Sequence, residues 1–130
     1  MNKRKGIEVT TYKEQGIVLK EVCAGLEEEG ISYYINSLEV KENIQDMESA
    51  QDKKLLQQTC IQSMDSSFFS CGLGIVENEV GFIISNLPSM SGDIKNNFIE
   101  YYKNPSKQEA RSVGSNVGRY IKKLPFKINS

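Results

Sequence analysis

Residues 17–38 read IVLKEVCAGLEEEGISYYINSL, and they contain the junction that decides the fold. The apolar positions up to Leu26 recur at spacings of three and four, which predicts one apolar stripe of a helix over residues 17–29. Gly30 can adopt the left-handed conformation that ends a helix. Residues 31–38 follow at once and are rich in β-forming side chains. A helix that passes directly into a strand is typical of an α/β domain.

The same criteria extend along the rest of the chain. Strands are predicted at residues 6–13, 31–38, 68–76, 80–85 and 98–102, and further helices at residues 50–64 and 107–123. Ser106 and Glu109 have the spacing of a capping box at the start of the last helix. The order β-α-β-α-β-β-β-α predicts an α/β domain with a mixed sheet and helices packed on it.

The composition excludes several classes of function. The 130 residues are the length of one domain, so we expect a single domain over residues 1–130, with residues 1–5 flexible. The 16 Lys and Arg residues are balanced by 17 Asp and Glu residues, which argues against a nucleic-acid-binding surface. The absence of histidine removes Ser-His and Cys-His nucleophiles and the commonest metal ligand.

Neither the N-terminal sequence nor the cysteines indicate secretion. The opening MNKRK leads into polar sequence without the apolar segment of a secretory signal, and no apolar run approaches the ~20 residues that cross a bilayer. Cys23, Cys60 and Cys71 are an odd number without metal-binding spacing, which is typical of buried thiols in a reducing compartment. We therefore expect a cytoplasmic protein without membrane contact.

The acidic triplet Glu27-Glu28-Glu29 stands at the end of the first predicted helix. A helix C-terminus carries partial negative charge, so each carboxylate is unfavourable there by a few tenths to ~1 kcal/mol. One interpretation is that one carboxylate meets a cation, either a metal ion or a Lys or Arg of a partner. The other is a solvated acidic corner, because exposed charges contribute little to stability.

Two glycine pairs also stand out. Gly72 and Gly74 form a G-x-G without the rest of a phosphate-binding motif, which favours close backbone approach within a strand. Gly114 and Gly118 lie one turn apart in the last predicted helix, where each costs ~1 kcal/mol relative to Ala. They leave a flat patch, either for packing within the domain or for a subunit contact. No serine has a base partner in the sequence, so the residues alone favour an interaction module over an enzyme.

Residues 21–31, EVCAGLEEEGI, resemble the E-V-x-x-G-I-E-E-E-G-I signature of the small subunit of diol/glycerol dehydratase reactivating factor. The medium subunit of B12-dependent diol dehydratase carries a similar signature. Three further stretches look like that family's paired central strands with an N-L-P turn, its R-x-x-G-x-N-x-x-R helix and its Leu-Pro-Phe ending: residues 72–75 with 81–88, 111–119 and 124–126. The resemblance implies a three-layer, single-domain α/β fold. Its sheet would be mixed and mostly parallel, with about five strands, as in an anticodon-binding domain.

The resemblance also implies a function. The chain would be the non-catalytic small subunit of a chaperone-like complex, a heterotetramer with a large ATPase subunit. ATP binding and hydrolysis on the large subunit would drive release of damaged cobalamin from inactivated diol or glycerol dehydratase, so that adenosylcobalamin can replace it. This chain would bind no cofactor alone. The complex would be cytoplasmic, and its association with a bacterial microcompartment is left open.

The resemblance assigns site residues as well. In the family the middle Glu of the triplet lies at the interface with the large subunit, near its magnesium, so Glu28 is a candidate Mg²⁺ ligand; a carboxylate is a suitable hard oxygen donor. The predicted interface comprises Glu27, Glu28, Glu29, Gly114 and Gly118. Two alternatives remain: a relative of the dehydratase medium subunit, which would bind cobalamin together with a catalytic subunit, and a stand-alone binding module for a small ligand.

Overall fold

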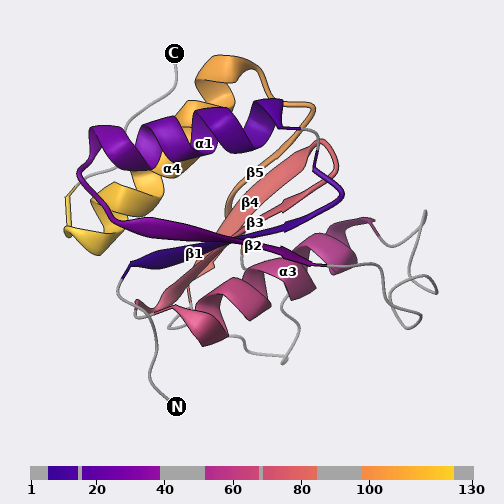
Figure 1. Ribbon diagram of the computed structural model, residues 1–130, viewed down its shortest axis with the longest axis horizontal. Helices are drawn as coiled ribbons and strands as arrows, with labels where there is room; N and C mark the ends of the chain where they lie inside the picture. Colours follow the sequence, from indigo (N-terminus) through magenta and orange to yellow (C-terminus); the bar gives the residue numbers. More distant parts are fainter. Residues whose placement is uncertain (1–5, 15, 39–51, 68, 85–97, 125–130) are drawn as a thin grey trace.

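The computed structural model describes residues 6–14, 16–38, 52–67, 69–84 and 98–124 (Figure 1). In these ranges the chain forms β1 (Ile7–Tyr12), α1 (Ile17–Glu28), β2 (Tyr33–Leu38), α3 (Asp52–Ser66), β3 (Cys71–Val76), β4 (Glu79–Ile84), β5 (Phe98–Lys103) and α4 (Lys107–Ile121). The predicted order of elements is confirmed. Several predictions concern residues outside the described ranges: the flexibility predicted for residues 1–5, the first two residues of the second predicted helix, residues 68 and 85, the N-L-P turn, and residues 125–126 of the Leu-Pro-Phe ending.

The strands form one mixed sheet in the order β2-β1-β3-β4-β5. β1 pairs in parallel with both β2 and β3, and Val9 stands opposite Leu73. β3 and β4 form an antiparallel hairpin, and β5 pairs antiparallel with β4. Of these five strands, four therefore run in one direction and β4 runs against them. This confirms a mixed, mostly parallel sheet.

Helices cover both faces of the sheet, which gives the three predicted layers. α1 and α4 lie side by side on one face, and α3 lies on the opposite face (Figure 1). The larger core fills the space between the sheet and the helices α1 and α4. Its fully buried side chains include Val22, Leu26, Val113, Leu73 and Phe82. A smaller core lies under α3 and includes Leu56, Cys60, Tyr12 and Ile83.

α3 approaches the sheet closely because glycines face it. A Cβ at Gly72 would lie 1.9 Å from the carbonyl oxygen of Cys60, and one at Gly74 would lie 3.0 Å from the Sγ of the same cysteine. No side chain larger than hydrogen fits at Gly72 without moving the helix. The close backbone approach expected for this pair is confirmed, and the backbone that approaches is that of α3.

Two serines, Ser63 in α3 and Ser67 just after it, supply hydrogen bonds to Glu8 of β1. Glu8 lies before the first residue pair of β1 and β3, Val9 and Leu73. The Ser63 hydroxyl donates to the carbonyl oxygen of Glu8 (2.5 Å) and accepts from the N–H of Leu73 (2.9 Å). The N–H of Glu8 donates to Oγ of Ser67 (2.9 Å). Buried backbone polar groups need such partners, so these serines fix α3 relative to the sheet.

On the other face, the backbones of α1 and α4 touch where the two helices cross. A Cβ at Gly25 would lie 2.1 Å from the carbonyl oxygen of Arg111, and a Cβ at Gly114 would lie 2.0 Å from the carbonyl oxygen of Val22. Each helix thus contributes one glycine to a reciprocal contact. Packing within the domain accounts for Gly114, and its predicted role at a subunit interface stays a prediction.

Gly118 lies one turn further along α4, over the end of α1. A Cβ there would lie 2.7 Å from the Cβ of Glu29 and 3.0 Å from Cγ1 of Ile31, both of which are side-chain atoms. Gly118 is also buried within the chain, so packing within the domain accounts for it as well. Its predicted role at a subunit interface stays a prediction.

Both long helices of this face end in left-handed residues. Gly30 has φ 72°, and the N–H of Ile31 donates to the carbonyl oxygen of Leu26 (3.0 Å), as expected for the predicted helix end. α4 ends at Ile121, two residues earlier than predicted, because Lys123 adopts φ 62° and reverses the chain. The predicted capping box of Ser106 and Glu109 is confirmed at the start of α4.

Replacing Ser63 by Ala should destabilise the fold by about 1–3 kcal/mol, because it leaves a buried carbonyl and a buried N–H without their partner. Chemical denaturation of Ser63→Ala measures the loss. Ser70→Ala is the matched control, since Ser70 is exposed and should change stability by less than about 0.5 kcal/mol. Equal stabilities of the two variants would show that the bridging hydroxyl is not needed.

Replacing Gly114 by Ala should also destabilise the isolated chain, by about 1–3 kcal/mol, although Ala is intrinsically the better helix former. The added methyl would strike backbone of α1, which cannot rotate away. Gly118→Ala is the graded comparison, because its methyl meets side-chain atoms that can shift, and we expect a smaller loss. Thermal unfolding of both variants tests this; a stabilised Gly114→Ala chain would contradict the internal role.

Candidate functional site

The acidic triplet at the end of α1 separates into three environments. Glu27 accepts a hydrogen bond from the hydroxyl of Tyr33 (2.5 Å). Glu29 is buried, with 9% of its surface exposed. The side chain of Glu28 is 42% exposed, and its carboxylate lies 3.4 Å from Nη1 of Arg111. The three residues are therefore not interchangeable, and Glu28 combines exposure with a cation partner.

Glu29 joins the end of α1 to α4. Its carboxylate accepts from Oγ of Ser115 (2.6 Å) and Nε of Arg119 (3.1 Å), and it lies 3.2 Å from Nζ of Lys122. These contacts, the Ser115 hydrogen bond first, lower the pKa of Glu29 from 4.5 to about 2 despite burial, which acts in the opposite direction. Glu29 is thus a structural residue of the helix pair.

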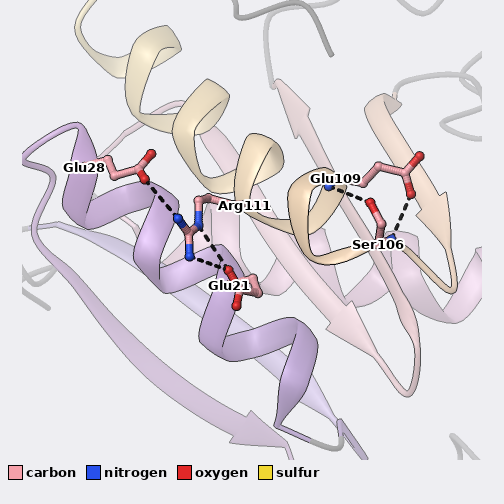
Figure 2. Close-up of polar contacts among 5 residues, drawn as sticks. All are labelled: Glu21, Glu28, Ser106, Glu109 and Arg111. Carbon is pink, nitrogen blue, oxygen red and sulfur yellow. Dashed lines mark hydrogen bonds and ion pairs between the residues drawn. The ribbon is translucent and has the colours of Figure 1, made fainter. Parts of the chain in front are cut away.

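Glu28 belongs to a second cluster, formed with Glu21 and Arg111 (Figure 2). Nε of Arg111 donates to Oε1 of Glu21 (3.0 Å), and Nη2 forms an ion pair with the same oxygen at 2.8 Å. The Glu21 side chain is only 10% exposed, and that of Arg111 is 48% exposed. Because Glu21 and Glu28 lie two helical turns apart on α1, one guanidinium of α4 reaches both.

The structure places cations of this chain at the triplet: Arg111 at Glu28, and Arg119 and Lys122 at Glu29. Of the two interpretations of the triplet, a contact with a metal ion or with a partner's Lys or Arg stays a prediction. Glu21 was not among the predicted site residues. The seven-residue spacing of the two glutamates was a signal for it, since that spacing puts them on one helix face.

Glu28 does not belong to a group of side chains that could hold a magnesium ion within the described part of this chain. The described segments contain no group of three or more Cys, Asp or Glu side chains that could hold a metal. A metal at Glu28 would therefore need its remaining ligands from another molecule. The Arg111 guanidinium, 3.4 Å from the carboxylate, opposes a metal on the same oxygen until that ion pair opens.

The thiols offer no reactive group. All three cysteines are buried, and desolvation raises the pKa of each, in the case of Cys71 to about 12. A neutral buried thiol is a poor nucleophile and a poor metal ligand.

Over the ranges that the structure describes, no helix is both long and apolar enough to cross a membrane.

The stabilisation from Glu29 should depend on pH. Its pKa is lower in the folded chain than its ordinary 4.5, so its contribution is present above pH 4.5 and is lost as the pH falls toward 2. Glu29→Gln should reduce the free energy of unfolding by about 1–2 kcal/mol at pH 7, and this difference should shrink between pH 4.5 and 2. Denaturation across that range measures it.

Ser115→Ala is the matched variant, because it keeps the carboxylate and removes its first-ranked donor. The pKa of Glu29 should then lie closer to 4.5, so the loss of stability should again begin near pH 4.5, but it should be smaller and should end at a higher pH than in the unaltered chain. Parallel loss of stability in the unaltered chain and in Glu29→Gln below pH 4.5 would exclude this role for Glu29.

Comparisons with known proteins agree on this fold. The chain aligns with a reactivating-factor chain of the structure of diol dehydratase-reactivating factor complexed with ADP and Mg²⁺ at 20% identity and a TM-score of 0.73, covering 96% of this chain and 99% of that one. A chain of glycerol dehydratase reactivase aligns at 18% identity and a TM-score of 0.72, covering 96% and 98%. Among curated protein sequences there is no significant match.

The family comparison covers nearly the whole sequence. The model described as dehydratase medium subunit matches residues 6–127, which include every described helix and strand. This range also contains the acidic triplet, Gly114 and Gly118, so the site lies inside the shared region. The chain therefore belongs to the dehydratase medium subunit family.

Proposed function

We propose that this chain is the non-catalytic small subunit of a diol or glycerol dehydratase reactivase. The observation that carries the proposal is the end-to-end fold match: 96% of this chain aligns with nearly the full length of chains from two reactivase structures. Its family membership, over residues 6–127, agrees with a protein of the dehydratase system. The proposed partner is a large ATPase subunit, and the proposed client is a dehydratase that carries damaged cobalamin.

In this proposal the chain contributes a surface rather than a reaction. The sequence contains no histidine, and the described thiols are buried and neutral. The helix pair α1–α4 is fixed by backbone contact and by ion pairs, so Glu28 is presented on a rigid support. ATP hydrolysis on the large subunit would supply the energy for cobalamin release, while this chain would bind that subunit and leave it during exchange.

Glu28 is the member of the predicted interface for which we propose a specific contact. Of its members, Glu29, Gly114 and Gly118 are buried within the chain, and Glu27 is held by Tyr33. We propose that Glu28 is the residue that meets the large subunit, as one oxygen ligand of its Mg²⁺. The other ligands and the bound ADP or ATP would belong to the large subunit.

Co-purification tests the assembly. The tagged chain would be isolated from its native host grown on 1,2-propanediol or glycerol, and the accompanying chains would be identified by mass spectrometry. We expect a large ATPase subunit in near-equal amount, and the complex should release cobalamin from inactivated dehydratase in an ATP-dependent manner. Recovery of dehydratase catalytic subunits with cobalamin and without an ATPase would instead support a subunit of the enzyme itself.

Glu28→Gln should weaken binding to the large subunit loaded with ADP and Mg²⁺ by about 10-fold or more, because an amide is a poorer Mg²⁺ ligand than a carboxylate. Isothermal titration measures the affinity, and circular dichroism should show an unchanged fold. Glu77→Gln is the matched control. It removes the same charge from the exposed β3–β4 turn, at the opposite end of the strands from Glu28, and should leave the affinity unchanged. Equal affinities of both variants would remove Glu28 from the interface.

A further inference from the structure

The two edge strands of the sheet differ in how they are protected against pairing with another chain. β5 carries Glu100 and Lys103 and has a register shift in its pairing with β4. Charges and bulges of this kind keep an edge strand from adding a further strand. β2, at the other edge, has neither charge nor proline from Tyr33 to Leu38, and it pairs with β1 through all 6 residues without a bulge. Of the two described edges, β2 is therefore the one open to pairing.

The backbone of β2 presents alternate residues to this open edge. The N–H of Ile7 donates to the carbonyl oxygen of Ser32, and Ile7 stands opposite Tyr33. In a parallel ladder with this register, the even-numbered residues of β2 bond to β1, so the N–H and C=O groups of Tyr33, Ile35 and Ser37 point away from it. No described strand pairs with these groups. Ile35 is also 46% exposed, so the edge offers an apolar side chain together with backbone donors and acceptors.

Helix α1 places two opposite charges beside the same edge. The hydroxyl of Tyr33 donates to Glu27, which fixes Glu27 over the beginning of β2. Lys20 lies seven residues earlier, so it is on the same face of the helix and about 10 Å away. Because the chain turns back from α1 into β2, Lys20 lies over the later part of the strand. Lys20 is exposed and forms no ion pair with any described residue.

We propose that β2 is the interface of a symmetric dimer of this chain, in which the two β2 strands pair antiparallel about a two-fold axis at Ile35. Ile35 then stands opposite its own copy, and Tyr33 stands opposite Ser37 of the second copy. These are the residues whose N–H and C=O groups point outward, so every such group within β2 gains a partner. The sheet becomes continuous through both copies, and the exposed Ile35 side chains cover each other.

The charges on α1 favour the same axis. The midpoint between Lys20 and Glu27 lies about 5 Å beyond Tyr33, or one to two residues along the strand, which is close to Ile35. A two-fold axis there brings Lys20 of each copy opposite Glu27 of the other, on one side of the joined sheet. The contact is thus complementary to itself, as a two-fold interface must be.

A second copy fits this surface better than a partner with a charge of one sign. Such a partner would be attracted by Lys20 or by Glu27 and repelled by the other, whereas a two-fold pairing satisfies both. The absence of charge in β2 is also what self-pairing requires, because a charged residue near the axis would face its own like charge. The inference does not rest on the proposed function, since it uses neither Glu28 nor a large subunit.

Sedimentation velocity of the free chain tests the dimer over a concentration series up to about 1 mM. We expect a monomer–dimer equilibrium that Ile35→Lys weakens by about 10-fold or more, because two ammonium groups would then face each other. Leu124→Lys is the matched control. Leu124 is 44% exposed and follows α4, which packs against β4 and β5, so this variant should leave the equilibrium unchanged. A chain that is monomeric throughout, or a dimer that Ile35→Lys leaves intact, would overturn the proposal.

Charge reversal tests the position of the axis. Lys20→Glu and Glu27→Lys should each weaken the dimer by about 3- to 10-fold, and the double variant should return to within about 2-fold of the unaltered chain. If Glu27 acted only within its own chain, the double variant would stay as weak as Glu27→Lys, since Tyr33 loses its acceptor in both. Circular dichroism confirms that each variant is folded. If the free chain is monomeric and Ile35→Lys instead weakens binding to a different protein, the edge takes a strand of that protein and the proposed dimer fails.

Discussion

The backbone contact between α1 and α4 is the constraint on which the rest of this structure depends. Gly25 and Gly114 allow each helix to touch a carbonyl oxygen of the other, and any side chain at either position would separate them. At the distance that results, Arg111 reaches two glutamates of α1, and Ser115 reaches the carboxylate of Glu29. The ion pairs follow from the crossing rather than cause it, since exposed pairs alone contribute too little to hold two helices together.

The opposite face of the sheet is built in the same way. Gly72 lets the backbone of α3 approach β3, and Ser63 then takes the place of a missing backbone partner between β1 and β3. Both helical layers are thus located by contacts with backbone, which has no alternative rotamers. An apolar core of Val, Ile and Leu tolerates repacking, whereas these contacts do not. The position of each helical layer relative to the sheet is therefore fixed.

Much of this fold could be predicted from local patterns. The spacing of apolar residues before Leu26, the left-handed Gly30 and the capping box at Ser106 each act within a few residues, and the structure has all three. The pairing of Arg111 with Glu21 could not be predicted, because the two residues are 90 positions apart and the rotation of one helix against another leaves no periodic signal. The same limit applies to Gly72. Its sequence context indicated a close backbone approach, but not that the approaching backbone belongs to α3.

The acidic triplet departs from the preference for basic residues at a helix C-terminus, and this departure can be interpreted only once the fold is known. Three carboxylates at a helix C-terminus are unfavourable. Arg119 and Ser115 of α4, and Lys122 directly after it, offset this by contacting Glu29. Tyr33 donates to Glu27. Glu28 is left with the longest cation contact of the triplet, on a surface that solvent screens. An exposed ion pair of this length contributes little to stability, so the three carboxylates of the triplet differ in how strongly they tie the end of α1 to the rest of the chain.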